Sequence, residues 1–253
     1  MATTSPTGGT RGRDEDATEF AYRVLRSDIL NGALTPGSTL SQAQLARDLG
    51  ISRTPLREAL RRLAAEHLVS GNFNQRMRVS ELDLEDLDQI YAMRIALEPV
   101  AVRATLPLDR PSRTALSRQL AKMAAAIEDR DLERFRREHR DFDMGIIAGT
   151  GTRMRTLLAT LWDQAERYRL AYLTNEGVAG EDTLLERLRV SQEEHEAILK
   201  AALTDDVEAC TNALVTHLER TVKLLFLDTV SVPKPQLSQA AAERHVTGTT
   251  RLP

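Results

Sequence analysis

The stretch Leu40–Leu63, LSQAQLARDLGISRTPLREALRRL, has the pattern of two short helices joined by a tight turn. Ser41 and Gln44 predict a capping box, in which two side chains bond free backbone N–H groups at a helix start. Gly50 ends the first helix, because a residue without Cβ readily adopts the left-handed conformation found there. Ser52 then caps the second helix. The order of these signals predicts a helix-turn-helix.

The second helix of this pair has an apolar side and a side rich in arginine. Leu56, Leu60 and Leu63 lie on one side at helical spacing. Arginine can donate two hydrogen bonds to guanine or bind phosphate, so an arginine-rich side suits a DNA groove. The alternative is a solvated arginine face on an ordinary helical hairpin. The candidate DNA contacts are exposed positions of this helix and of the hairpin that follows it: Ser52, Arg53, Thr54, Pro55, Arg57, Arg61, Asn74, Gln75 and Arg76.

The segments on both sides of the helix pair complete a winged helix. Leu68–Ser70 and Gln75–Val79 predict two short strands around the turn Gly71–Asn74. Phe20–Leu30 has the pattern of an amphipathic helix. Residues 17–80 contain nine Lys or Arg and five Asp or Glu, a net charge of +4 in a chain of −3, so the remainder carries −7. A basic module on an acidic body is typical of a DNA-binding protein with a second functional part.

The rest of the chain predicts helices. Amphipathic segments separated by Pro, Gly or polar residues predict a mainly α protein, with an antiparallel bundle of about six helices at residues 81–230. Pro99 predicts a kink or break in the first of them. Residues 1–16 and 231–253 lack apolar periodicity and predict a disordered N-terminal arm and a flexible C-terminal tail. The expected helices are Leu84–Leu106, Ser112–Asp129, Leu132–Ala148, Met154–Thr174, Thr183–Leu203 and Asp206–Leu227.

Composition and short motifs exclude several classes of protein. A single cysteine, Cys210, excludes a disulfide framework and a cysteine-based zinc finger, and it is compatible with a reducing cytoplasm. No apolar run approaches the ~20 residues of a membrane span, and the N-terminus has no signal-peptide core. The sequence contains no Gly-rich phosphate loop, GxSxG or HExxH. We therefore expect a cytoplasmic protein without a membrane partner.

Three of the five histidines fall at inward-facing helical positions. His139, His195 and His217 each continue an apolar stripe on a different expected helix, and Asp143 shares a helix face with His139. A buried carboxylate is unfavourable unless it is paired or binds a cation. Three imidazoles and one carboxylate converging in a bundle predict a divalent-metal site, whose donors suit Zn, Ni, Mn or Fe. The alternative is that the histidines only fill the core.

Two runs of the sequence resemble a known family. ILNGALTPGSTLSQAQLARDLGISRTPLREALRRLAAEHLV, which starts at Ile29, resembles the DNA-binding domain of GntR-family bacterial transcription regulators. SRTPLREALRRL is the most specific part of this match. ELDLEDLDQIYAMRIALEPVAVRA, which starts at Glu81, resembles the beginning of the FadR-type C-terminal domain, called the FCD domain. The resemblance covers about residues 17–230 and implies that Arg53 and Arg57 contact the operator.

The resemblance also bears on the expected metal site. Metal-binding FCD domains carry an Asp-x-x-x-His pair on one helix and two later histidines, and His195 and His217 match the spacing of those two. The order of the pair is reversed in this chain. His139 stands where the family has Asp, and Asp143 stands where it has His.

The resemblance reaches the wing tip and an effector pocket as well. The family often has a glycine at the wing tip that reaches the minor groove, where this chain has Asn74 and Gln75. Arg94 matches an arginine of the first FCD helix, which implies that it binds an acidic effector near the metal by two hydrogen bonds. The alternative for Arg94 is a salt bridge within its own helix to Glu98, four residues later.

We therefore expect a homodimeric transcription regulator, a repressor, that binds a short inverted repeat in double-stranded DNA. A small effector, expected to be an organic acid, would favour one arrangement of the two DNA-binding domains. The alternative from another class is a metal-dependent enzyme with an accessory nucleic-acid-binding domain. We do not expect an enzyme, because no general base is evident: Glu194 and Glu196 flank His195 but point to other helix faces.

Overall fold

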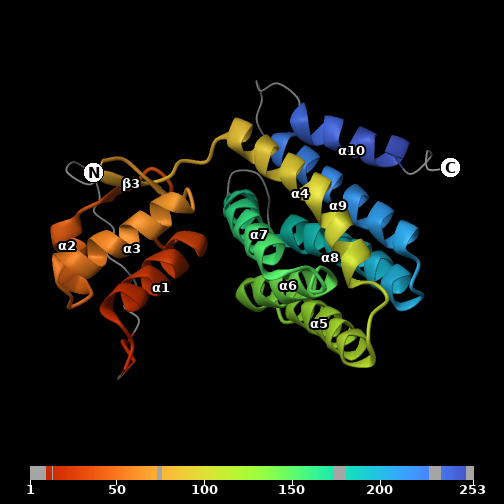
Figure 1. The fold of residues 1–253 in the computed structure, drawn as a ribbon, viewed down its shortest axis with the longest axis horizontal. Coiled ribbons are helices and arrows are strands. Elements are labelled where there is room, and N and C mark those ends of the chain that lie inside the picture. Colours follow the sequence, from red (N-terminus) through yellow and green to blue (C-terminus); the bar gives the residue numbers. More distant parts are fainter. Residues whose placement is uncertain (1–9, 13, 73–75, 174–180, 228–234, 249–253) are drawn as a thin grey trace. The chain divides into compact units, whose positions relative to one another are not determined.

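The protein is mainly helical and forms two compact units, an N-terminal winged helix and a C-terminal helical bundle (Figure 1). The computed structural model describes residues 10–12, 14–72, 76–173, 181–227 and 235–248. The expected fold class is confirmed. Each unit has its own core.

The winged helix begins with three helices whose ends follow local signals. Its elements are α1 (Ala17–Leu30), β1 (Thr39–Leu40), α2 (Gln42–Asp48), α3 (Arg53–Ala65), β2 (Val69–Ser70) and β3 (Met77–Val79). The Ser41 side chain accepts a hydrogen bond from the Gln44 backbone N–H at the start of α2. The Gln44 side chain bonds Arg47 and Asp48, so it does not close the expected capping box. Gly50 has a positive φ of 63° directly after α2, as its position in the tight turn requires.

A three-stranded antiparallel sheet completes this unit, in the order β1-β3-β2. The expected hairpin corresponds to β2 and β3, but β1 was not predicted from the sequence. Met77 and Val79 of β3 are buried whereas Arg78 between them is exposed, which gives the wing one packed face. The core lies between this sheet and the three helices, and it includes Leu25, Leu45, Leu56, Leu60, Leu63 and Met77.

The second unit is a bundle of long helices (Figure 1). Its elements are α4 (Leu84–Thr105), α5 (Arg110–Glu128), α6 (Leu132–Ile146), α7 (Thr152–Leu173), α8 (Glu181–Leu203), α9 (Val207–Leu227) and α10 (Leu237–Gly248). Asp163–Ala171 of α7 are grouped with the first unit. Helix α4 packs against α9 and α10, whereas α8 packs against both α5 and α9. The expected kink or break at Pro99 does not end α4, which continues as one helix through this buried proline. No helix among the described residues is long and apolar enough to cross a membrane.

Helix α10 corrects the expectation of a flexible tail at residues 231–253. The described part of this segment, residues 235–248, contains a helix that packs on α4 and α9. Asp88 of α4 caps it: its carboxylate accepts hydrogen bonds from the backbone N–H groups of Gln236, Leu237 and Ser238 and from the Ser238 hydroxyl. The tail prediction failed because the buried side of α10 consists of small residues such as Ser238 and Ala242, which give little apolar periodicity.

The end of the expected N-terminal arm is also attached to the fold. Asp16 caps α1, and Glu15 forms a salt bridge with Arg23 of that helix. These contacts fall within the described residues 14–16 of the segment that was expected to be a disordered arm. Glu15 and Asp16 are therefore part of the folded unit and not of a disordered arm.

Asp88→Ala is expected to release the start of α10. Loss of a helix cap weakens a helix by about 0.5–2 kcal/mol, and the cap here is a carboxylate that bonds three backbone N–H groups. Burial alone would raise the pKa of Asp88, but the hydrogen bonds from Ser238 and its neighbours outweigh burial and lower it. The cap is therefore complete at neutral pH and is lost only as the pH falls through this depressed pKa. Hydrogen-exchange mass spectrometry should show faster exchange at 237–248 in Asp88→Ala. Gln89→Ala, an exposed neighbour, should leave that exchange unchanged, and equal exchange in both variants would refute the capping role.

Candidate functional site

The first candidate site is the N-terminal end of α3, where the predicted DNA contacts gather. Ser52, Arg53, Thr54 and Arg57 are all exposed, and Pro55 is partly buried in the first turn of the helix. Ser52 occupies the N-cap position, but its side chain makes no capping hydrogen bond. The exposed side chains at the start of α3 are therefore accessible to a ligand.

The arginines of α3 differ in how strongly the protein itself engages them. Arg62 bonds Glu19 and lies over the Tyr22 ring, with its guanidinium carbon 3.7 Å from the ring centroid. Arg61 forms an exposed salt bridge with Glu58. Among the described residues, no ion pair or hydrogen bond engages the side chains of Arg53 and Arg57. These two guanidinium groups are the ones that remain available for DNA bases or phosphates.

The wing contributes part of the predicted interface. Arg76 is exposed directly before β3, and Arg78 is exposed on that strand. Asn74 and Gln75, the other predicted wing contacts, lie outside the described residues. The described part of the wing therefore adds positive charge, in keeping with the basic character of residues 17–80.

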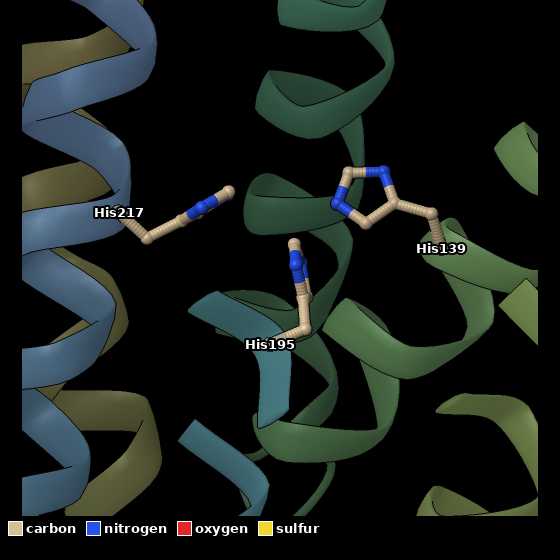
Figure 2. Close-up of side chains that lie close together, drawn as sticks. All are labelled: His139, His195 and His217. Carbon is tan, nitrogen blue, oxygen red and sulfur yellow. The ribbon is translucent and has the colours of Figure 1, made fainter. Parts of the chain in front are cut away.

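The second candidate site is a buried cluster of histidines in the bundle. His139 of α6, His195 of α8 and His217 of α9 point toward one another from three helices (Figure 2). One ligand atom from each ring lies within 4.8 Å of those of the other two. The ring centroid of His195 lies 4.6 Å from that of His139 and 4.5 Å from that of His217. The bundle thus brings together the three histidines that the sequence places at inward-facing positions.

Asp143 lies beside two of the three histidines, although the group of ligand atoms within 4.8 Å of one another consists of the three rings only. Its Oδ1 lies 3.2 Å from His195 Nε2, and its Oδ2 lies 3.3 Å from His139 Nε2. Oδ2 also accepts a hydrogen bond of 2.7 Å from the indole N–H of Trp162 on α7. Burial alone would raise the pKa of Asp143, but the neighbouring His139, His195 and Arg94 outweigh burial and lower it well below its usual value. Asp143 is therefore an ionised carboxylate inside the bundle.

The hydrogen bonds of His195 reveal a mismatch that a cation would remove. Nδ1 lies 2.6 Å from the backbone oxygen of Ser191, which can only accept, so Nδ1 carries a proton. In a neutral ring, Nε2 then has a lone pair and no proton. This lone pair faces the Asp143 carboxylate, so two acceptors are 3.2 Å apart. A second proton on the ring or a metal ion would make this arrangement favourable, and the donor set therefore fits a divalent metal.

His217 is oriented in a similar way by a residue that sequence reasoning misjudged. Its Nδ1 lies 2.7 Å from Glu194 Oε2, which leaves Nε2 for the cluster. Burial, together with the neighbouring His195, lowers the pKa of His217 to about 4, so the ring is neutral at pH 7. Glu194, which was expected only to flank His195, bonds His217 on the adjacent helix and is also bonded by Arg220. A hydrogen bond to the second nitrogen is typical of metal-binding histidines.

Arg94 lies beside the cluster and is already paired. Its Nε donates a hydrogen bond of 2.6 Å to Glu98, so the salt bridge within α4 does form. Its Nη2 lies 3.8 Å from Asp143 Oδ2, too far for a hydrogen bond. Burial disfavours the charge of Arg94, but the adjacent Glu98 carboxylate outweighs burial and raises the pKa of Arg94 above its ordinary value. Arg94 therefore stays charged, with terminal nitrogens that the salt bridge does not use.

Sequence reasoning did not identify Trp162 or Ser191 as members of this site. Trp162 donates a hydrogen bond to Asp143 on another helix. The backbone oxygen of Ser191 bonds Nδ1 of His195 within the same helix. The sequence offered one usable signal, since Trp162 is the only tryptophan in the chain and buried indoles usually have a hydrogen-bond acceptor. Its partner lies 19 residues away on another helix, which no periodicity indicates.

Two protein-family models match the chain in the same order as the two units. Residues 17–79 match the family described as bacterial regulatory proteins, gntR family, and residues 89–220 match the FCD domain. The histidine cluster lies within the second match, and α3 lies within the first. Helix α10 lies beyond both matches.

Similar proteins have the same organisation. The HTH-type transcriptional regulator YdhC of Bacillus subtilis is 29% identical over 205 residues, which cover 80% of this chain and 91% of YdhC. The HTH-type transcriptional repressor GlaR of Escherichia coli is 27% identical over 203 residues, which cover 78% of this chain and 90% of GlaR. The solved structure of Escherichia coli McbR/YncC superposes with a TM-score of 0.72 at 28% identity, over 84% of this chain and 98% of McbR. These matches are transcriptional regulators and not enzymes. The chain therefore belongs to the GntR family of bacterial transcriptional regulators, with a DNA-binding winged helix and a C-terminal FCD domain.

Proposed function

We propose that the protein is a homodimeric repressor of the FadR subfamily, acting in the cytoplasm, whose operator binding responds to a small carboxylate. The observation that carries this proposal is the buried cluster of three histidines and Asp143 beside the charged Arg94. A bundle that serves only as a scaffold does not require five polar side chains at one buried point. The related GlaR is named a repressor, which supports the same direction of regulation here.

The cluster would hold one divalent metal ion through His139, Asp143, His195 and His217. Imidazole nitrogens and a carboxylate suit Zn, Ni, Mn or Fe, and the donors alone do not choose among them. When bound, the metal would supply positive charge and an open coordination position for an anionic ligand. The residues of this chain would fix its ligands, because Ser191 and Glu194 hold the Nδ1 atoms of two of the rings.

Arg94 would bind the effector next to the metal. Its only hydrogen bond among the described residues is the one from Nε to Glu98, so its terminal nitrogens can donate to a carboxylate. Arg94 belongs to α4, the first helix after the wing, so an effector held there contacts the helix that leads to the DNA-binding unit. The effector would release the operator if it binds more tightly to an arrangement of the dimer that does not fit DNA.

The exposed side of α4 would form the contact between the two copies. Met93 and Val100 are two of the four large apolar side chains exposed among the described residues, and both belong to α4. Ala96 and Leu97 lie between them, so the four residues form a stripe one helical face wide. This stripe contains no charge, as is typical of the centre of an interface. A two-fold axis would place it against the same stripe of a second copy, and that dimer would match an inverted repeat.

Val100→Glu, alone or with Met93→Glu, is expected to convert the dimer to a monomer, because it places two like charges opposite each other across the two-fold axis. Light scattering after size exclusion should then show the single-chain mass of 28.2 kDa where the wild type shows twice that mass. Leu157→Glu is the matched control, since Leu157 is an exposed apolar residue of α7 outside the stripe. A Val100→Glu protein that stays dimeric would rule out the stripe as the interface.

Selection of bound fragments from random DNA would test the function as a whole. We expect enrichment of a short inverted repeat, with an affinity that falls steeply as salt rises because several phosphates are contacted. Short mono- and dicarboxylates would then be screened by thermal shift on protein loaded with each candidate metal, and the hits tested for operator release. The regulatory proposal fails if no sequence is enriched, and the effector proposal fails if no carboxylate changes operator affinity.

A further inference from the structure

The reversed His139/Asp143 pair gives the carboxylate a neighbour that sequence reasoning did not anticipate. The two oxygens of Asp143 face different partners. Oδ1 lies 3.2 Å from His195 Nε2, whereas Oδ2 accepts a hydrogen bond of 2.7 Å from Trp162 Nε1 and lies 3.3 Å from His139 Nε2. Both Asp143 and Trp162 are almost completely buried, at 6% and 3% exposure. The indole contact is thus a fixed part of the interior.

The chemistry of the indole explains why this contact matters. An indole N–H can only donate, so it cannot compete with the imidazoles for a cation. By bonding Oδ2, it fixes the rotation of the carboxylate and leaves Oδ1 directed at Nε2 of His195. Helix α7 places no histidine in the cluster, but through Trp162 it holds the Asp143 carboxylate beside the cluster. Hydrogen bonds of this kind orient metal-binding carboxylates in other sites.

We infer that Trp162 is a positioning residue for the metal site, which orients Asp143 so that its Oδ1 faces His195 Nε2 beside the three-histidine group. This inference rests on the metal site proposed above. The carboxylate of Asp143 can rotate about its last side-chain bond unless a neighbour fixes one of its oxygens. The N–H of Trp162 supplies that constraint, whereas the rest of the ring fills space.

The test distinguishes the effect of losing the indole N–H from the effect of altered packing around Trp162. Trp162→Phe keeps an aromatic ring and removes the donor. Leu158→Val, one turn earlier on α7, removes a buried methylene and leaves the hydrogen bond intact. Co²⁺ is titrated into each protein against a competing chelator, and the visible spectrum of the bound ion is recorded because it reports the ligand set. We expect Trp162→Phe to bind Co²⁺ about 10- to 100-fold more weakly and with an altered spectrum. Leu158→Val should match the wild type in both.

A second measurement does not depend on the folding of Trp162→Phe. The chain has one tryptophan, so a ¹⁵N-labelled wild-type protein shows a single indole N–H resonance. Addition of Zn²⁺ should shift this resonance in the wild type and leave it in place in Asp143→Ala. Two results would overturn the role of Trp162 but leave the metal site standing. One is equal Co²⁺ affinity and spectrum in the wild type and Trp162→Phe. The other is an indole resonance that does not move in a wild type that binds Zn²⁺. A wild type that binds no metal would overturn the metal site together with this inference.

Discussion

Arg57→Ala is expected to weaken operator binding by about 1–3 kcal/mol, or about 5- to 150-fold, if the guanidinium donates to a base. The same range applies to Arg53→Ala. Among the described residues, these are the arginines of α3 that no ion pair or hydrogen bond engages, so removing them leaves no unpaired partner inside the protein. The loss should therefore appear in DNA binding and not in the free energy of unfolding.

Fluorescence anisotropy with the selected operator and with a scrambled duplex would measure this effect over a range of salt concentrations. A base contact should lower affinity for the operator more than for the scrambled duplex, whereas a phosphate contact should weaken both and reduce the salt slope by about one. Arg118→Ala is the charge-matched control, because Arg118 is an exposed arginine of α5 in the bundle. If Arg118→Ala and Arg57→Ala weaken operator binding equally, the start of α3 does not read the operator.

The arginines of α3 show what the sequence alone could and could not establish at this interface. The helix, its caps and its arginine side were predictable, because they depend on residues within one or two turns of each other. Which arginines are available was not predictable. Arg62 bonds Glu19, which is 43 residues away on α1, and only the folded chain brings these two residues together.

The same division holds for the bundle. Helical periodicity placed His139, His195 and His217 on inward faces, and the structure brings these rings together with Asp143. The hydrogen bonds that orient them were not predictable, since Glu194 reaches His217 across 23 residues. Strand β1 and helix α10 were missed for a related reason. The first is two residues long, and the second is capped by Asp88, about 150 residues away in sequence.

The double variant His195→Ala/His217→Ala is expected to abolish metal binding. The two rings come from different helices, and both have their Nδ1 atoms bonded to other residues, so each offers one nitrogen to the cluster. Elemental analysis after extensive dialysis should find about one divalent ion per wild-type chain and none in the variant. At free metal 100-fold above the dissociation constant, binding adds about 2.7 kcal/mol to stability. For a protein of this size, that corresponds to about 5–10 °C in melting temperature, which a chelator should remove from the wild type only.

Two comparisons make this result specific to the cluster. His67→Asn changes an exposed histidine of the winged helix to a residue that tolerates its positive φ of 55°, and it should keep both the metal and the chelator-sensitive melting temperature. The melting temperatures of the metal-free proteins show how much the double variant loses through packing alone, because both rings are buried. A wild type without metal, or a double variant that still binds it, would mean that these histidines fill the core. In that case the effector would have to be held by Arg94 and its neighbours without a metal.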